Sequence, residues 1–452
     1  MSYKSGIINN LISNTLEITF PDGDCETITE ANIVSESMKL KQAISDGDEL
    51  RFGGCIASEF TIDILKTYDA ENDAVFPDVD LTGKWIAVKL TQTYADPETP
   101  VYPSSTLYPS GNVYPGKTVG NKEFWIFSGY IDSAKVNKND KNVITLTAYD
   151  ALALLHETDA TDFLYSFFKT SEGTYNIRLL LQRALSVTYN NTVDINHTGL
   201  ATIFKERYTN TFGVDTQVES FNPYNEYWLS RKDKITFGAL IKSICEMIAV
   251  FGIIIPDSGK GLFTFKRLNE NTETYEFYEA LETEEYQATG YTDFQFSLSD
   301  GNEPRPGKSI LGGGLTDASG GAADKIYDFS ENIMVLMPYT TSVQGRMPTE
   351  FDVLINRTSI GTRLALNAES TAHRGQCAFS SYTPLTATLD GRPWVSVGSP
   401  IEILVNKTTL DGSFVYDEND NIIKESVKTY VLSRTLTGIQ ALTDKIEVKG
   451  AR

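Results

Sequence analysis

Histidine and cysteine are scarce in this chain, whose 452 residues include three of the first and four of the second. The sequence has neither an HExxH pair nor the closely spaced Cys and His residues of a zinc finger. The cysteines are far apart and form no CxxC pair, so we expect buried, reduced thiols. They are Cys25, Cys55, Cys245 and Cys377. We therefore predict no metal-binding residues.

Long apolar runs are also absent. Residues 1–15 lack the apolar core of about 7–15 residues that a signal peptide needs, and no segment approaches the ~18 apolar residues of a membrane-spanning helix. We therefore expect no membrane span and expect the chain to be made and folded in the cytoplasm.

Positive charge is in the minority, with 39 Lys and Arg against 60 Asp and Glu, a net charge of −21 and a pI near 4.6. A protein that wraps duplex DNA needs cationic side chains to displace counterions, so this composition argues against DNA binding. An acidic surface is still compatible with DNA as a passenger, because a channel that lets a polyanion slide through must not hold it.

The length supports roughly three domains at about 150 residues each, and 41% hydrophobic residues are enough for buried cores. Residues 1–149 show short alternating or β-rich segments separated by Gly, Asp and Asn, which predict a small barrel or sandwich. The expected strands are Leu16–Phe20, Ser58–Leu65, Lys84–Thr93, Glu123–Val136 and Val143–Tyr149. Residues 95–121, rich in Pro, Tyr, Ser and Gly, are expected to project as an inserted loop.

Residues 150–326 are predicted to form a mixed α+β middle region. Apolar residues recur at helical spacing in residues 150–156, 162–169 and 175–187. Residues 236–268 are typical of an apolar helix followed by an extended segment, a turn and a strand. An acidic stretch, 269–300, and a Gly-rich linker, 301–323, follow.

Residues 327–452 are predicted to be a second β-rich region with one helical element near 362–372. Leu385–Val397 and Lys428–Leu442 are interpreted as paired strands, with turns at Asp390-Gly391 and at Gly438. Thr386, Thr388 and Trp394 are expected within these strands.

Several enzyme motifs occur in the wrong context. Gly111–Thr118 matches the phosphate-loop pattern, but no apolar strand precedes it, Pro115 removes a backbone donor, and a strand rather than a helix is expected after it. Gly307–Ser309 has the wrong spacing for the same motif. Asp317–Gly321 has a protease-like Ser-Gly pair, but Ala318 precedes the serine and no histidine has a catalytic context.

Carboxylates and aromatic residues are abundant but do not define a site. Asp78 with Asp80 and the run Asp417–Asn421 are interpreted as solvated turns, and Ile422 stands where a calcium loop needs glycine. Tyr102, Tyr108 and Tyr114 in the inserted loop leave open a carbohydrate or partner contact, although packing of the loop on its own domain is favoured. We predict no catalytic, cofactor-binding or metal-binding residues.

A series of short segments, in this order, resembles the tail or baseplate hub proteins of long-tailed phages and phage-like contractile injection particles, in particular those of prophages of Gram-positive bacteria. The segments are Gly53–Phe60, Phe127–Asp132 with Ala148–Leu152, Leu240–Met247 before Leu262–Phe265, and Arg392–Trp394 with Leu436–Gln440. The resemblance implies a mainly β fold with two tube-type β-barrel domains around an α+β middle. It also implies a homotrimer in which two barrels per subunit form a pseudo-sixfold ring.

The function expected from this resemblance is structural and non-enzymatic. The ring joins a sixfold tail tube or distal tail ring to a threefold spike or fibre apparatus, and DNA or the tape-measure protein passes through its lumen. The expected location is the tail of a virion or phage-like particle, after synthesis in the bacterial host. The alternatives are a receptor- or glycan-binding β-protein of a tail tip and a tail-associated cell-wall hydrolase.

Overall fold

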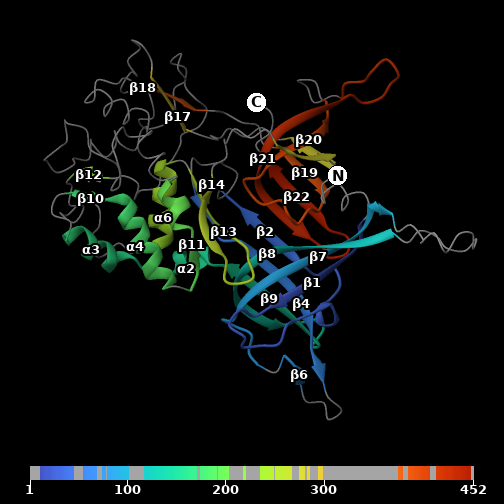
Figure 1. Cartoon of the computed structure of the whole chain (residues 1–452), viewed down its shortest axis with the longest axis horizontal. Coiled ribbons are helices and arrows are strands. Elements are labelled where there is room, and N and C mark those ends of the chain that lie inside the picture. The colour runs from blue at the N-terminus through green and yellow to red at the C-terminus, as the bar shows by residue number, and fades with distance from the viewer. Residues whose placement is uncertain are drawn as a thin grey trace, which may run out of the picture.

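The computed structural model is mainly β with a small number of helices, as expected from the sequence (Figure 1). It describes residues 11–44, 54–68, 74–77, 79–100, 117–170, 174–190, 192–202, 217–219, 235–248, 250–266, 274–279, 282–285, 294–298, 375–379, 385–407 and 414–448. The Gly-rich linker 301–323 and the helical element near 362–372 lie outside the described residues. In the described part, no helix is long and apolar enough to cross a bilayer.

Twelve of the described strands form one sheet that includes both β-rich ends of the chain. We call β1, β2, β4, β7, β8 and β9 the first β region, and β15, β16 and β19–β22 the second. The first set comprises β1 (Leu11–Thr19), β2 (Lys39–Ala43), β4 (Glu59–Leu65), β7 (Trp85–Pro100), β8 (Lys117–Val136) and β9 (Val143–Asp150). The second comprises β15 (Glu276–Glu279), β16 (Glu282–Glu285), β19 (Leu385–Asp390), β20 (Pro400–Asn406), β21 (Lys424–Thr437) and β22 (Thr443–Val448).

These strands form where apolar residues alternate with polar ones, because neighbouring side chains of a strand point to opposite faces. In β4 the side chains of Phe60, Ile62 and Ile64 are buried and those between them are not. β20 has the same alternation through Ile401, Ile403 and Val405. The five predicted strands of the first β region are confirmed, but β1 and β8 begin at Leu11 and Lys117, earlier than expected, and β7 extends to Pro100. β2 was not predicted.

The inserted loop predicted for residues 95–121 is partly wrong. Its two ends extend the antiparallel pair β7 and β8, with Ala95 opposite Val119 and Asp96 opposite Thr118. Polar residues are acceptable there because this ribbon extends beyond the rest of the sheet (Figure 1). Residues 101–116, with Tyr102, Tyr108 and Tyr114, lie outside the described residues.

The predicted pairing at the end of the chain is also partly wrong. β19 ends at Asp390, and Trp394 lies in the turn that follows, where Gly391 and Pro393 interrupt the strand. β19 pairs with β22, not with β21, which pairs with β2, β20 and β22. Thr386 and Thr388 are in a strand, as predicted.

The middle region contains the helices and the helix-turn-strand unit predicted for it. The helices are α2 (Leu152–Glu157), α3 (Thr161–Thr170), α4 (Ile177–Tyr189) and α6 (Phe237–Ile248). α6 leads into β13 (Phe251–Ile255) and β14 (Leu262–Lys266), which form a four-stranded sheet with β11 (Asp194–Ile195) and β3 (Gly54–Cys55). Because β3 comes from the first part of the chain, this small sheet ties the middle region to the first β region.

Shorter described elements complete the fold. They are η1 (Glu30–Asn32), the pair β5 (Thr67–Tyr68) and β6 (Ala74–Phe76), the pair β10 (Thr174–Asn176) and β12 (Gln217–Glu219), and the pair β17 (Phe294–Leu298) and β18 (Gly375–Phe379).

The acidic stretch after residue 269 contributes two strands to the second β region. β15 pairs with β20 in parallel, and β16 pairs with β19 in the antiparallel sense. The two short strands therefore lie against the two outer strands of the group β20, β21, β22 and β19. The sheet branches at β21, and no described pairing joins β1 to β2 or β15 to β16. The two closed barrels therefore stay a prediction. The division of the chain at residues 149 and 326 is likewise a prediction.

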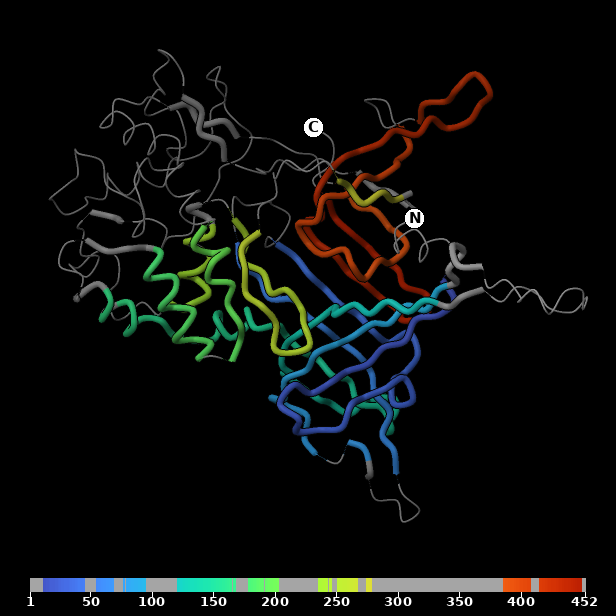
Figure 2. Tube along the Cα trace, viewed as in Figure 1, coloured from blue at the N-terminus to red at the C-terminus, as the bar shows by residue number. Residues whose placement is uncertain are grey.

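Two hydrophobic cores lie beneath this sheet, and each takes residues from the other end of the chain. Leu436 and Ile439, from the end of the sequence, are buried in the core of the first β region. Ile44 and Phe251 are buried in the core of the second. Figure 2 shows the blue and red ends of the tube side by side, consistent with this exchange.

A buried ion pair fixes the last two strands of the second β region. Arg434 Nε lies 2.8 and 2.9 Å from the two carboxylate oxygens of Asp444, and Nη2 lies 2.7 Å from Oδ2. The guanidinium also donates to the backbone oxygens of Arg392 and Val395. Both charged side chains are almost fully buried, so the pair also holds the turn after β19 against β21.

Loss of one partner leaves a buried charge without compensation, which costs about 3–5 kcal/mol. We expect Asp444→Leu to lower the free energy of unfolding by that order, measured by urea denaturation. The double variant Arg434→Met with Asp444→Leu is expected to lose less than Asp444→Leu alone. An equal or larger loss in the double variant would contradict this account.

Candidate functional site

The junction of the two β regions is built around the turn that follows β21. β21 pairs with β2 over Lys39–Ala43, so the second β region continues the edge of the first. After Thr437 the chain turns at Gly438, whose N–H donates to the backbone oxygen of Met38 at 3.1 Å. Gly438 has a φ of 83°, a left-handed conformation that glycine adopts without penalty. We call residues 438–440 the junction turn.

Side chains of the first β region hold the junction turn through its backbone. Asn14 Nδ2 donates to the backbone oxygens of Ile439 at 2.9 Å and Gln440 at 3.2 Å. The carboxylate of Glu36 accepts the N–H of Ile439 at 2.8 Å and that of Gln440 at 3.0 Å. Asn14 is fully buried, and its Oδ1 accepts a bond from Gln92 Nε2 at 3.0 Å. The polar groups brought inside by the turn are therefore paired, as burial requires.

The junction turn thereby bridges β1 and β2, the two outer strands of the first β region. Asn14 lies on β1, and Met38 immediately precedes β2. Sequence reasoning singled out Leu436–Gln440 and the bend at Gly438. It missed Asn14 and Glu36, because single polar residues in a β-rich segment have no distinguishing pattern.

A second contact ties the middle region to the first β region. Ser128 Oγ donates to the backbone oxygen of Asp257, and the N–H of Asp257 donates to Ser128 Oγ, both at 3.0 Å. Asp257 Oδ1 accepts the N–H groups of Gly259 and Gly261, which closes the turn between β13 and β14. Lys260, at the tip of this turn, forms an ion pair with Asp22 at 2.8 Å.

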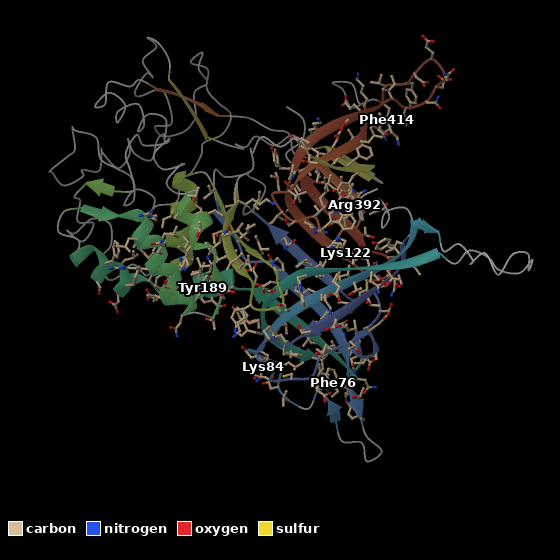
Figure 3. The ribbon with its side chains drawn as sticks, viewed as in Figure 1. Phe76, Lys84, Lys122, Tyr189, Arg392 and Phe414 are labelled. Atoms are coloured by element: carbon tan, nitrogen blue, oxygen red, sulfur yellow. The ribbon has the colours of Figure 1, made fainter. Side chains whose placement is uncertain are left out.

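A third contact clasps β15 against the turn after β19. Glu276 Oε1 accepts bonds from Arg392 at 3.0 Å and from Trp394 Nε1 at 2.9 Å. The guanidinium of Arg392 lies 3.8 Å from the centre of the Tyr278 ring, close enough for a cation–π interaction. Figure 3 labels Arg392 within the second β region. The segment Arg392–Trp394, which was part of the resemblance, therefore has a packing role.

A cavity of about 330 Å³ opens where these three parts meet. Its walls are mostly apolar and come from β2, β8, β13 and the turn after β19. Its lining includes Glu123, Trp125, Asp150, Trp394 and Arg434. Of its charged groups, Arg434 is bound to Asp444, so the cavity offers carboxylates and indole rings rather than a free cation.

Asp150 is the buried carboxylate of this cavity. Its Oδ2 accepts the N–H of Ser58 at 2.9 Å, and its Oδ1 accepts the N–H of Leu152 at 3.0 Å, at the start of α2. Burial raises its pKa from 3.8 to about 6, although the hydrogen bonds from Ser58 and Leu152 oppose that rise. Because both oxygens are used to position backbone, the geometry assigns Asp150 a structural role.

The residues considered for metal or nucleotide binding are not brought together. Within the described residues, no group of three or more His, Cys, Asp or Glu is arranged to hold a metal ion. Asp417 Oδ1 accepts the N–H groups of Asn419 and Asn421, so this carboxylate closes a turn, as predicted. Asp80 closes another turn through Thr82.

The remaining sequence candidates fall mostly outside the described residues. Lys117 and Thr118, the end of the phosphate-loop match, begin strand β8 rather than a helix. Residues 111–116, 307–309 and 317–321, together with Asp78, are not described. Cys55 and Cys245 are buried, reduced thiols, as predicted, and burial raises the pKa of Cys55 well above its ordinary value. Cys25 is reduced but only partly buried, so its predicted burial is wrong.

The junction turn gives a stability prediction with a matched control. A Cβ on Gly438 would lie 2.5 Å from the backbone oxygen of Ala441 and 2.6 Å from Glu36 Oε2, whereas a Cβ on Gly83 would meet nothing within 4 Å. Both glycines have positive φ, so alanine costs each about 1–2 kcal/mol in backbone strain. We expect Gly438→Ala to destabilise the protein more than Gly83→Ala in urea unfolding. Equal losses of unfolding free energy in the two variants would show that the junction turn accommodates the added Cβ at no extra cost.

Asp150 gives a prediction about pH. Since its pKa is raised to about 6 in the folded chain, the unfolded chain loses this proton first as pH rises, and folding stability falls between about pH 4 and pH 6. This loss is on the order of 3 kcal/mol at about 1.4 kcal/mol per pKa unit. We expect the difference in unfolding free energy between wild type and Asp150→Asn to change with pH only in that window. A constant difference from pH 3.5 to pH 8 would contradict it.

Neither a protein-family model nor a curated protein matches this sequence. Among solved structures, the chain is similar to the 43 kDa tail protein of prophage MuSo2 from Shewanella oneidensis, with a TM-score of 0.41 and 9% identity over 96% of this chain and 97% of that one. An E. coli component of the type VI secretion system, described as similar to T4 tail proteins, gives 0.37 and 7% over 96% and 77%. The phage P2 baseplate in its activated conformation with Ca gives 0.26 and 8% over 96% and 98%. The neighbours found for this chain are therefore components of phage tails, of a baseplate and of a secretion system.

Proposed function

We propose that this chain is a structural hub of a phage or phage-like tail. In this proposal three copies form a ring that joins a sixfold tail tube or distal tail ring to a threefold spike or fibre, and DNA or the tape-measure protein passes through the ring. The proposal is supported by the ordered series of hub-like segments in the sequence. Three of those segments, Arg392–Trp394, Leu262–Phe265 and Leu436–Gln440, lie at or beside the contacts between the parts of the chain.

The observation that carries the proposal is the junction turn. A hub must present two β regions in a fixed relative orientation, because three copies offer the tube six equivalent contacts only if each chain holds its two regions rigidly. The pairing of β2 with β21, the bonds to Asn14 and Glu36, and the exchange of core residues supply that rigidity. We infer that the two β regions act as barrel-type units of such a ring, separated by the middle region.

The charge of the chain supports the same proposal. A net charge of −21 per chain suits a channel through which a polyanion must pass without being held. Such a ring is located in the tail of a virion or phage-like particle, after synthesis of the chain in the cytoplasm of a bacterial host. No catalytic step is part of this function.

The cavity favours a second candidate, a glycan-binding protein of a tail tip. Trp125 and Trp394 line it together with Glu123 and Asp150, and indole rings beside carboxylates provide the stacking faces and hydrogen-bond acceptors that sugars use. The use of Asp150 for backbone positioning and of Trp394 for the bond to Glu276 weighs against this candidate.

The two candidates differ in assembly state. We expect the purified chain to form a trimer with three times the chain mass of 50.1 kDa, measured by native mass spectrometry and by light scattering after size exclusion. A stable monomer that binds polysaccharide through the cavity, with binding lost in Trp125→Ala, would overturn the hub proposal in favour of the second candidate.

A further inference from the structure

A projecting arm extends from the second β region between β20 and β21. We call residues 414–423 the arm. Backbone bonds from Val415 to Lys407 at 3.0 Å and from Ile423 to Val415 at 2.8 Å order it, and Tyr416 pairs with Ile422 across its tip. Figure 3 shows Phe414 on this extension, beyond the body of the second β region.

The arm has an apolar face that this chain leaves uncovered. Phe414, Tyr416 and Ile422 are 47%, 54% and 37% exposed. Phe414 and Tyr416 are two residues apart in an extended segment, and Ile422 is the cross-strand partner of Tyr416, so the three side chains share one face. Two aromatic residues and an isoleucine on one exposed face are typical of a protein contact surface.

The tip of the arm adds negative charge. Asp417 is used by the turn, but Glu418 and Asp420 are exposed, and within the described part of the chain neither forms an ion pair. The arm is therefore an apolar face with two uncompensated carboxylates at its end. A fitting partner surface has exposed aliphatic residues beside uncompensated cations.

The turn between β8 and β9 has that chemistry. Exposed lysines surround the exposed Val136 in this turn, and in the described residues they have no carboxylate partner. They are Lys135, Lys138 and Lys141. The only acid of the turn, Asp140, accepts the N–H of Asn142. The turn lies beside the end of β4, since Lys66 donates its N–H to the backbone oxygen of Asn142 at 2.8 Å.

The two surfaces do not meet within one chain. The bond from Lys66 places the β8–β9 turn beside the start of β5, which pairs with β6 at Phe76. Figure 3 shows Phe76 and Phe414 at opposite ends of the molecule. A threefold ring requires an interface between two different patches of each copy, and these two patches are complementary in both charge and polarity.

We propose that the arm of one copy docks on the β8–β9 turn of the next copy. The apolar face of the arm covers Val136, and Glu418 and Asp420 pair with the lysines of the turn. This inference rests on the proposed trimer and names the surfaces that form it. Such a contact weakens with added salt, because its charges lie at the rim.

A charge exchange tests the contact in the full chain. One variant carries Glu418→Lys and Asp420→Asn, since asparagine tolerates the φ of 61° at that position. A second carries Lys135→Glu and Lys138→Glu. We expect each variant to raise the concentration at which the trimer dissociates by at least about tenfold. The chain that carries all four substitutions is expected to recover most of the lost trimer stability. The control Lys39→Glu with Lys445→Glu makes the same change in net charge as the second variant, but elsewhere, and is expected to leave the trimer intact.

The outcomes separate this inference from the function on which it rests. A wild-type trimer that neither variant weakens would overturn the arm contact and leave the hub proposal standing. Weakening by both variants without recovery in their combination would also overturn it, because the charges would then not face each other. If only the arm variant has an effect, the arm binds another part of the trimer. A monomeric wild-type chain would overturn both proposals.

Discussion

The insertion of the junction turn between β1 and β2 is the constraint on which the rest of the structure depends. Through it, Leu436 and Ile439 belong to the first core although they lie near the end of the sequence. Arg434, paired with Asp444, positions the turn after β19. This turn also holds β15, because Arg392 binds Glu276. A series of local contacts thus runs from Asn14 to the far edge of the second β region.

Polar residues, rather than reactive ones, have the specific roles in this molecule. Asn14, Glu36, Asp150 and Arg434 all form hydrogen bonds with backbone groups. A buried polar group that lacks a partner costs more than its bond contributes when made, so such residues select one arrangement of the chain over others of similar apolar content. That use of polar side chains is in keeping with a protein whose task is to hold a shape.

Sequence reasoning predicted the local elements well and the long-range pairing poorly. Alternation in β4 and β9 and the helical spacing of α6 are properties of a few adjacent residues, so the sequence contains them directly. The pairing of β2 with β21 joins residues almost four hundred positions apart. Neither strand has a sequence feature that identifies its partner. β15 and β16 were missed because each has only four residues and a Glu at both ends, and Glu has a low strand propensity that tertiary contacts override. Trp394 was misplaced because its β-favouring neighbours concealed the effect of Gly391 and Pro393.

The exchange of core residues also sets the order in which this chain is completed during synthesis. β1, β7, β8, β9 and β4 emerge from the ribosome early, but their core lacks Leu436 and Ile439 until nearly the whole sequence has been translated. The first β region therefore has unpaired edges at β1 and β2 until the hairpin of β21 and β22 has been made. Contacts of such high sequence separation form slowly, and unpaired strand edges are prone to association during that interval. Closure of the first core therefore requires translation to have passed residue 448, where β22 ends.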